Sequence, residues 1–182
     1  MMDTRHGMVI VDYPNMDFGA KRKVLRGFVD LHEIRKAADE VSRTLIQKRV
    51  LFVSDIYWDG LFEFKKRYIL AQILADEFHL EIVPVAPTLR NSQQRLIPSH
   101  LVKKGGAKKI EDPVDLAMIN YCETRRECVS TLVVVSSDGG FAPLVKSFGG
   151  FVVYYDTPSR ELIKVAQRSI QARPGRGLRR LW

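Results

Sequence analysis

Two aspartates follow apolar, β-branched runs at positions where a carboxylate could take part in chemistry. Asp12 ends "VIVD" and is followed by "YPN", which places the side-chain amide of Asn15 three residues later. Asp138 follows "VVVSS" and precedes Gly139 and Gly140, so nothing bulky crowds its carboxylate. We expect no helix start directly after Asp12, and therefore do not interpret this acid as a helix cap.

A divalent metal ion is the simplest reason to collect such acids in one place. Neither Asp12 nor Asp138 has a basic residue in its own segment, and neighbouring carboxylates without basic partners repel one another. Mg²⁺ or Mn²⁺ removes that repulsion and prefers oxygen ligands. Asp115, in the first turn of a predicted helix, is the natural third carboxylate. The sequence therefore predicts a metal site formed by Asp12, Asp115 and Asp138, with Asn15 beside it.

The elements that must position these residues alternate along the chain. Continuous apolar runs predict strands over 7–13, 49–56, 80–87, 130–137 and 150–157. Amphipathic stretches predict helices over 28–47, 59–78, 111–127, 140–149 and 159–170, and the first has a helical apolar period through Leu31, Ile34, Ala38, Val41 and Leu45. This alternation predicts a doubly wound α/β fold with a mainly parallel sheet of about five strands. In such sheets the working site lies beyond the carboxyl ends of the strands.

The charge balance of the chain favours a polyanionic partner. The 182 residues, enough for one domain, include 29 Lys and Arg against 21 Asp and Glu, a net charge of +8. Such a balance suits nucleic acid, with simple solubility as the alternative. The candidate RNA-binding residues flank the predicted acidic site: Lys21, Arg22, Lys23, Arg26, Lys103, Lys104, Lys108 and Lys109. The tail adds Arg173, Arg176, Arg179 and Arg180.

Several other classes of protein are disfavoured. Cys122 and Cys128 fall on different sides of a helix, which suggests neither a disulfide nor a zinc site. The first predicted strand is not followed by the glycine pattern of a dinucleotide site, and no phosphate-binding GxxxxGK[ST] loop occurs. The start lacks the apolar run of a signal peptide, and no segment is long and apolar enough to cross a membrane. We expect a cytoplasmic protein without a membrane partner.

Three blocks, in order, carry a family resemblance: "VIVDYPNMDFG", "KKIEDPVDLAMINYC" and "LVVVSSDGGFAPLVKSFGGFVVYYDT". Together they resemble the NYN domains of the PIN-like nuclease superfamily, with the LabA-like branch the most similar. The later "SRELIKVAQRSI" is similar to the helix that closes that fold. The likeness spans about residues 7–170, so we expect an NYN-like domain over 1–170 and a basic C-terminal tail over 171–182.

The resemblance implies a metal-dependent ribonuclease, or a domain descended from one, with an acidic pocket at the carboxyl edge of a parallel sheet. By motif position, Asp12 and Asn15 match the family's D-x-x-N block. Asp115 matches the acid that opens the middle helix, and Asp138 matches the first acid of the S-G-D-S-D-F block.

The chain departs from the family pattern within the same blocks. Ser137, Gly139 and Gly140 stand where the last block has a glycine, a serine and its second aspartate. Many relatives carry a further acid about two turns into the middle helix, where this chain has Asn120 and Tyr121. These losses leave less negative charge in the pocket.

The sequence therefore predicts a metal-dependent endoribonuclease that hydrolyses RNA phosphodiester bonds. Mg²⁺ or Mn²⁺ is expected on Asp12, Asp115 and Asp138, while Asn15 orients water or a phosphate oxygen. An alternative is a catalytically weakened NYN-like domain that acts as an RNA- or protein-binding module. A third is a small-molecule phosphatase that does not need the basic loops. A homodimer or another protein partner stays open.

Overall fold

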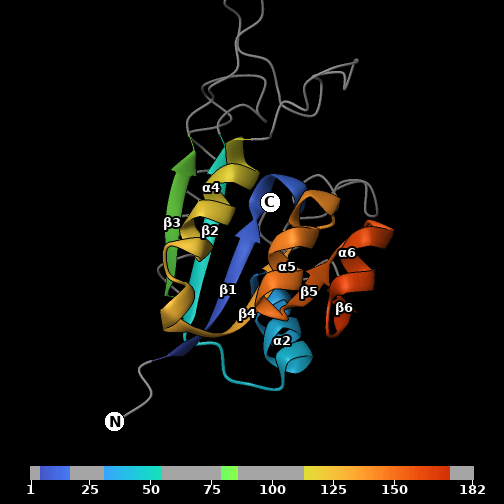
Figure 1. The fold of residues 1–182 in the computed structure, drawn as a ribbon, viewed down its shortest axis with the longest axis horizontal. Coiled ribbons are helices and arrows are strands. Elements are labelled where there is room, and N and C mark those ends of the chain that lie inside the picture. The colour runs from blue at the N-terminus through green and yellow to red at the C-terminus, as the bar shows by residue number, and fades with distance from the viewer. Residues whose placement is uncertain (1–4, 17–30, 55–78, 86–112, 173–182) are drawn as a thin grey trace, which may run out of the picture.

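A six-stranded parallel β-sheet forms the centre of the molecule (Figure 1). The computed structural model describes residues 5–16, 31–54, 79–85 and 113–172. The strands are β1 (His6–Asp12), β2 (Lys48–Ser54), β3 (Leu80–Val85), β4 (Val129–Val135), β5 (Phe151–Tyr154) and β6 (Ser169–Gln171). They lie in the order β3-β2-β1-β4-β5-β6, and every neighbouring pair is parallel. The predicted α/β fold with a parallel sheet is confirmed.

Helices cover both faces of this sheet. The α-helices are α2 (Leu31–Ser42), α4 (Pro113–Glu123), α5 (Ala142–Phe148) and α6 (Arg160–Val165), and short 3₁₀ helices are η2 (Arg126–Cys128) and η3 (Gly139–Phe141). Figure 1 shows α4, α5 and α6 in front of the sheet and α2 behind it. Along β1, Val9 and Val11 pack into the core on the α2 side, while Met8 and Ile10 pack into the core under the other helices. The central strand is therefore apolar on both faces, as a covered parallel sheet requires.

The order of the strands reverses at the centre of the sheet. From β1 the chain continues to β2 and β3 on one side, whereas β4, β5 and β6 lie on the other. The carboxyl ends of β1 and β4 are neighbours, with Val11 opposite Val135. In open α/β sheets, the carboxyl ends of the strands at which the order reverses are the usual place for a ligand.

The final strand was not expected from the sequence. The helix predicted over 159–170 ends at Val165, and Ser169–Gln171 pairs with β5 as β6, so the sheet has six strands rather than about five. The intervening backbone already follows the sheet, because Gln167 N–H donates to the Gly150 carbonyl at 3.0 Å. Three residues of strand are too short to show an alternating pattern in the sequence.

Two predicted helices end earlier than expected. α2 ends at Ser42, and Arg43 adopts a left-handed backbone with φ 54°, so the helical period stops there. Leu45, predicted on the buried face, is 69% exposed, and Ile46 is buried in its place. The helix predicted over 111–127 ends at Glu123. The helix predicted over 59–78 lies outside the described residues.

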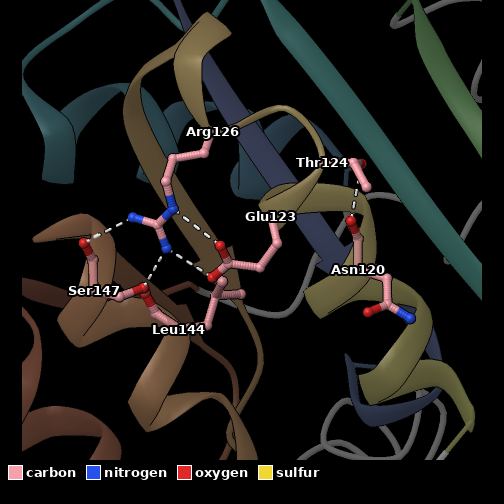
Figure 2. Close-up of polar contacts among 6 residues, drawn as sticks. All are labelled: Asn120, Glu123, Thr124, Arg126, Leu144 and Ser147. Atoms are coloured by element: carbon pink, nitrogen blue, oxygen red, sulfur yellow. Dashed lines mark hydrogen bonds and ion pairs between the residues drawn. The ribbon is translucent and has the colours of Figure 1, made fainter.

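The end of α4 is tied to α5 by one guanidinium group (Figure 2). Arg126 donates to both carboxylate oxygens of Glu123, at 2.9 and 2.7 Å. It also donates to the Ser147 carbonyl at 3.1 Å and to the Ser147 hydroxyl at 2.9 Å. The same group lies 4.0 Å from the centre of the Phe148 ring. The contact therefore joins the carboxyl end of α4 to the carboxyl end of α5.

The two cysteines differ in their exposure to solvent. Cys122 is buried and Cys128 is exposed, and both are free thiols. Burial raises the pKa of the Cys122 thiol to about 12, so this group stays protonated and unreactive. In the described ranges, no helix is long and apolar enough to cross a bilayer.

Gly149 ends α5 in a backbone conformation that favours glycine. Its φ is 57°, and its N–H bonds to the Lys146 and Val145 carbonyls. We expect Gly149→Ala to lower the free energy of unfolding by about 1–2 kcal/mol, because a Cβ strains the left-handed region. Gly149→Asn should cost less, since asparagine tolerates this region. Urea unfolding followed by circular dichroism measures both; equal losses would contradict a backbone origin.

Candidate functional site

Asp12 is a buried carboxylate at the carboxyl end of β1. It is 5% exposed, and Oδ2 accepts a hydrogen bond from the hydroxyl of the fully buried Ser136 at 2.9 Å. Oδ1 accepts a hydrogen bond from the backbone N–H of Asn15 at 3.2 Å. A buried charge is tolerated only where donors replace the lost water. The site therefore begins with a carboxylate that is held in place by the protein.

The prediction that no helix starts after Asp12 is wrong. Residues 13–16 are helical, and the bond from Asn15 N–H makes Asp12 the N-cap of this turn. Pro14 does not prevent the helix, because the first-turn N–H that it lacks has no partner within a helix. The Asp12 charge is thus stabilised by the start of a helix as well as by Ser136.

Ser136 and Asn15 link the end of β1, where Asp12 lies, to the backbone that follows β4. The Ser136 hydroxyl accepts the Asp138 N–H at 3.1 Å while it donates to Asp12. The Asn15 side-chain oxygen accepts the Ser137 N–H at 2.9 Å. Asn15 therefore lies beside the end of β4, where its side-chain oxygen holds the backbone of the loop that follows this strand. Asp12 and Asn15 act first as positioning residues.

Asp138 is the exposed acid of the site. Its backbone is extended, with φ −80° and ψ 133°, and its Oδ1 accepts the Gly140 N–H at 2.8 Å, which caps η3. Within the part of the chain that is described, its Oδ2 accepts no hydrogen bond. Phe141 is fully buried beneath this loop, as expected of a core residue. The carboxylate is fixed at one oxygen and presents the other outward.

The side-chain carboxylates of Asp115 and Asp138 both lie next to Gly140. A Cβ built on Gly140 would lie 3.1 Å from Asp115 Oδ2 and 3.4 Å from Asp138 Oδ1. Both carboxylates therefore border the space that the missing side chain leaves. The fold brings together two acids that are 23 positions apart in the sequence, one from the first turn of α4 and one from the end of β4.

The three predicted metal ligands are not equivalent. Asp115 and Asp138 meet at Gly140, whereas the Asp12 carboxylate is buried against Ser136 and reaches Asp138 through that hydroxyl. In residues 5–16, 31–54, 79–85 and 113–172, no three His, Cys, Asp or Glu side chains form a group that could hold a metal ion. Asp115 and Asp138 therefore form a pair, and Asp12 is a separate, buried carboxylate.

The residues at which the chain differs from the NYN pattern make local contacts of their own. A Cβ on Gly139 would lie 2.6 Å from the Ser159 hydroxyl oxygen, so a serine does not fit without rearrangement. Tyr121 donates to Glu81 Oε2 at 2.8 Å and stacks with the Arg125 guanidinium 3.8 Å from the ring centre. Asn120 is exposed, and its backbone carbonyl accepts a hydrogen bond from the Thr124 hydroxyl at 2.9 Å (Figure 2).

The basic residues predicted to bind RNA cannot be placed relative to the acidic site. Lys21, Arg22, Lys23, Arg26, Lys103, Lys104, Lys108 and Lys109 lie outside the described residues, as do the four arginines of the tail. Ser136, which links Asp12 to Asp138, was not singled out. The available signal was a small hydroxyl residue at the exit of an apolar run, directly before the acid.

Removing the Ser136 hydroxyl should destabilise the fold. Ser136→Ala leaves Asp12 Oδ2 buried without its donor, which should lower the free energy of unfolding by about 1–3 kcal/mol. Ser130→Ala, at an exposed position of β4, should change it by less than about 0.5 kcal/mol. Chemical denaturation of both variants measures this difference. If the two losses were equal, Asp12 would not depend on Ser136.

Comparison with known proteins supports the architecture. No family model and no curated protein matches this chain. Among solved structures, it is similar to the crystal structure of a protein of unknown function from Vibrio parahaemolyticus. The two chains share 15% sequence identity with a TM-score of 0.57, over 94% of this chain and 95% of the other. At this identity, the likeness is one of fold alone.

Proposed function

We propose that this protein is a metal-dependent endoribonuclease whose metal ion binds between Asp115 and Asp138. The observation that carries the proposal is the approach of these two carboxylates across Gly140, at the switch point of a parallel sheet. Paired carboxylates at a ligand-binding edge are a common way to hold a divalent cation. The resemblance to NYN domains supports the same residues in the same roles.

The donor set suits Mg²⁺ or Mn²⁺. Both carboxylates offer hard oxygen ligands, and Mg²⁺ is commonly held by one or two carboxylates together with substrate phosphates and water. Asp138 has an outward oxygen for this purpose, and Asp115 Oδ2 borders the same space. When bound, the metal would polarise a phosphoryl oxygen and activate a water for in-line attack.

The remaining residues hold the acids for that chemistry. Asp12 holds the Ser136 hydroxyl, and Ser136 holds the backbone N–H of Asp138. The Gly140 N–H restrains one oxygen of Asp138, so that the other keeps its direction. The absence of a side chain at Gly140 lets Asp115 Oδ2 and Asp138 Oδ1 both lie close to its backbone. This revises the expected role of Asp12 from metal ligand to positioning residue.

RNA as the substrate is supported by the charge of the chain. Its net charge of +8 would counter the repulsion between an acidic site and a phosphate backbone. β3 ends and α4 begins at the carboxyl end of the sheet (Figure 1), and the basic stretch that contains Lys103 and Lys104 lies between them in the sequence. Contacts of this kind give affinity without sequence choice.

A second candidate function is a binding module with little or no catalysis. The observation that favours it is the lack, among the described residues, of a group of three acids able to hold a metal. In this form the protein would bind RNA or a protein partner through its basic surface. Binding without cleavage would then be its whole activity.

The nuclease proposal predicts metal-dependent cleavage that requires Asp138. Incubation with labelled single-stranded and hairpin RNA should yield cleavage with Mn²⁺ or Mg²⁺ and none with EDTA. Asp138→Asn should reduce the rate at least about 100-fold, because it removes the outward carboxylate. Glu40→Gln, at an exposed acid on α2, is the matched control and should retain the full rate.

Three outcomes separate the candidates. Cleavage that persists in EDTA and in Asp138→Asn indicates a contaminating nuclease. RNA binding without cleavage at any metal concentration contradicts the nuclease proposal and supports the binding module. Turnover of p-nitrophenyl phosphate without RNA cleavage identifies the small-molecule phosphatase instead.

An acid placed at position 140 should strengthen metal binding. Gly140→Asp sets a third carboxylate beside Asp115 and Asp138, so it should lower the unfolding temperature in EDTA through repulsion. Mn²⁺ should then stabilise this variant more than the natural protein, by about 1.4 kcal/mol for each tenfold gain in affinity. Gly140→Asn has the same size without the charge. Equal Mn²⁺ shifts in the two variants, by differential scanning fluorimetry, would rule out a metal at this point.

A further inference from the structure

A hydroxyl and a carboxylate from the start of α6 lie beside the loop that carries Asp138. A Cβ built on Gly139 would lie 2.6 Å from Ser159 Oγ and 3.8 Å from Glu161 Oε2. The two oxygens are therefore close to one point next to Gly139, the residue that directly follows Asp138. We call Ser159 and Glu161 the hydroxyl–carboxylate pair.

The backbone and the core fix this pair relative to the acidic site. Ser159 N–H donates to the Ser137 carbonyl at 3.0 Å, which joins the residue before α6 to the residue before Asp138. Leu162, directly after Glu161, is fully buried and belongs to the core cluster beneath the Asp138 loop. The start of α6 is thus held against this loop by a hydrogen bond and by apolar packing.

The hydroxyl–carboxylate pair is accessible to a ligand. Ser159 is partly exposed and Glu161 is exposed. N-cap serines usually bond to the first turn of their helix, but the Ser159 side chain makes no such bond to α6. Within residues 5–16, 31–54, 79–85 and 113–172, neither the Ser159 hydroxyl nor the Glu161 carboxylate has a hydrogen-bond or ion-pair partner. Both groups can therefore bind a ligand at the same point.

The chemistry of this pair differs from that of the two acids next to it. The acids of the proposed metal site border Gly140, whereas the pair borders Gly139, and the Cα atoms of adjacent residues are about 3.8 Å apart. The Glu161 carboxylate repels a phosphate but accepts a hydrogen bond from a neutral hydroxyl, and the Ser159 hydroxyl can donate one. The pair therefore suits a hydroxyl group that donates to Glu161 and accepts from Ser159.

We propose that the hydroxyl–carboxylate pair binds a ribose 2′-hydroxyl and makes the acidic site select RNA over DNA. The 2′-hydroxyl is both a donor and an acceptor, and it is the group by which a protein distinguishes RNA from DNA. Since a phosphodiester is bonded directly to its sugars, a phosphate held at Gly140 brings a ribose next to Gly139. The inference rests on the proposed function, because it takes RNA as the ligand of the acidic site.

Fluorescence anisotropy in EDTA tests this selection by binding alone, with labelled single-stranded RNA, 2′-O-methyl RNA and DNA of one sequence. We expect the full-length chain to bind RNA about fivefold or more tightly than DNA. The 2′-O-methyl RNA should bind like DNA, because the methyl group removes the donor. Ser159→Ala and Glu161→Ala should each reduce the preference for RNA to less than about twofold.

The ratio of the two affinities is the readout, because removal of the Glu161 charge strengthens the binding of RNA and DNA alike. Ser130→Ala and Glu127→Ala are the matched controls, since they change the same residue types at exposed positions near the opposite end of β4. Both should keep the full preference for RNA. Thermal unfolding of the four variants checks that each is folded.

The outcomes separate this inference from the nuclease proposal. Loss of the RNA preference in Ser159→Ala and Glu161→Ala supports the inference even if no metal ion promotes cleavage, in which case the protein is the RNA-binding module. RNA cleavage by the natural protein, together with an unchanged preference in both folded variants, leaves the nuclease proposal intact and shows that the inference is wrong. Equal binding of RNA and DNA by the natural protein, or binding of neither, also overturns it.

Discussion

The hydrogen bond between the Ser136 hydroxyl and the Asp12 carboxylate joins the two central strands at the point where their connections diverge. A charge that is 5% exposed needs donors in place of water, and the Ser136 hydroxyl and the Asn15 N–H are two of them. Ser136 also accepts a hydrogen bond from the backbone N–H of Asp138. The buried Asp12 therefore helps to position the backbone of the exposed Asp138. The geometry of the site thus depends on a carboxylate that the solvent barely reaches.

Much of the fold was predictable because a parallel sheet leaves a strong local pattern. Runs such as "VIV" and "VVV" belong to strands whose residues are apolar toward both faces, and all of the described predicted strands are present. Local pattern failed where tertiary contacts decide. β6 owes its existence to pairing with β5, and α2 stops at Arg43 even though Leu45 continues the helical period.

The sequence was enough to predict where the candidate site lies, but not which of its acids is buried and which is exposed. Parallel strands end at one edge, which sufficed to place Asp12 and Asp138 near each other. A sequence does not show which of two acids is buried, and the short helix after Asp12 was hidden by Pro14. Nor does it show that Gly140 marks the space between Asp115 and Asp138, because that closeness depends on how α4 packs against the sheet.

The two edges of the described sheet are poor templates for further strands. β6 is only three residues long, and β3, at the other edge, contains Pro84, which has no N–H to offer a ladder. Short strands and proline are devices that prevent edge-to-edge aggregation. An amyloid-like extension of the described sheet is therefore disfavoured at both of its edges.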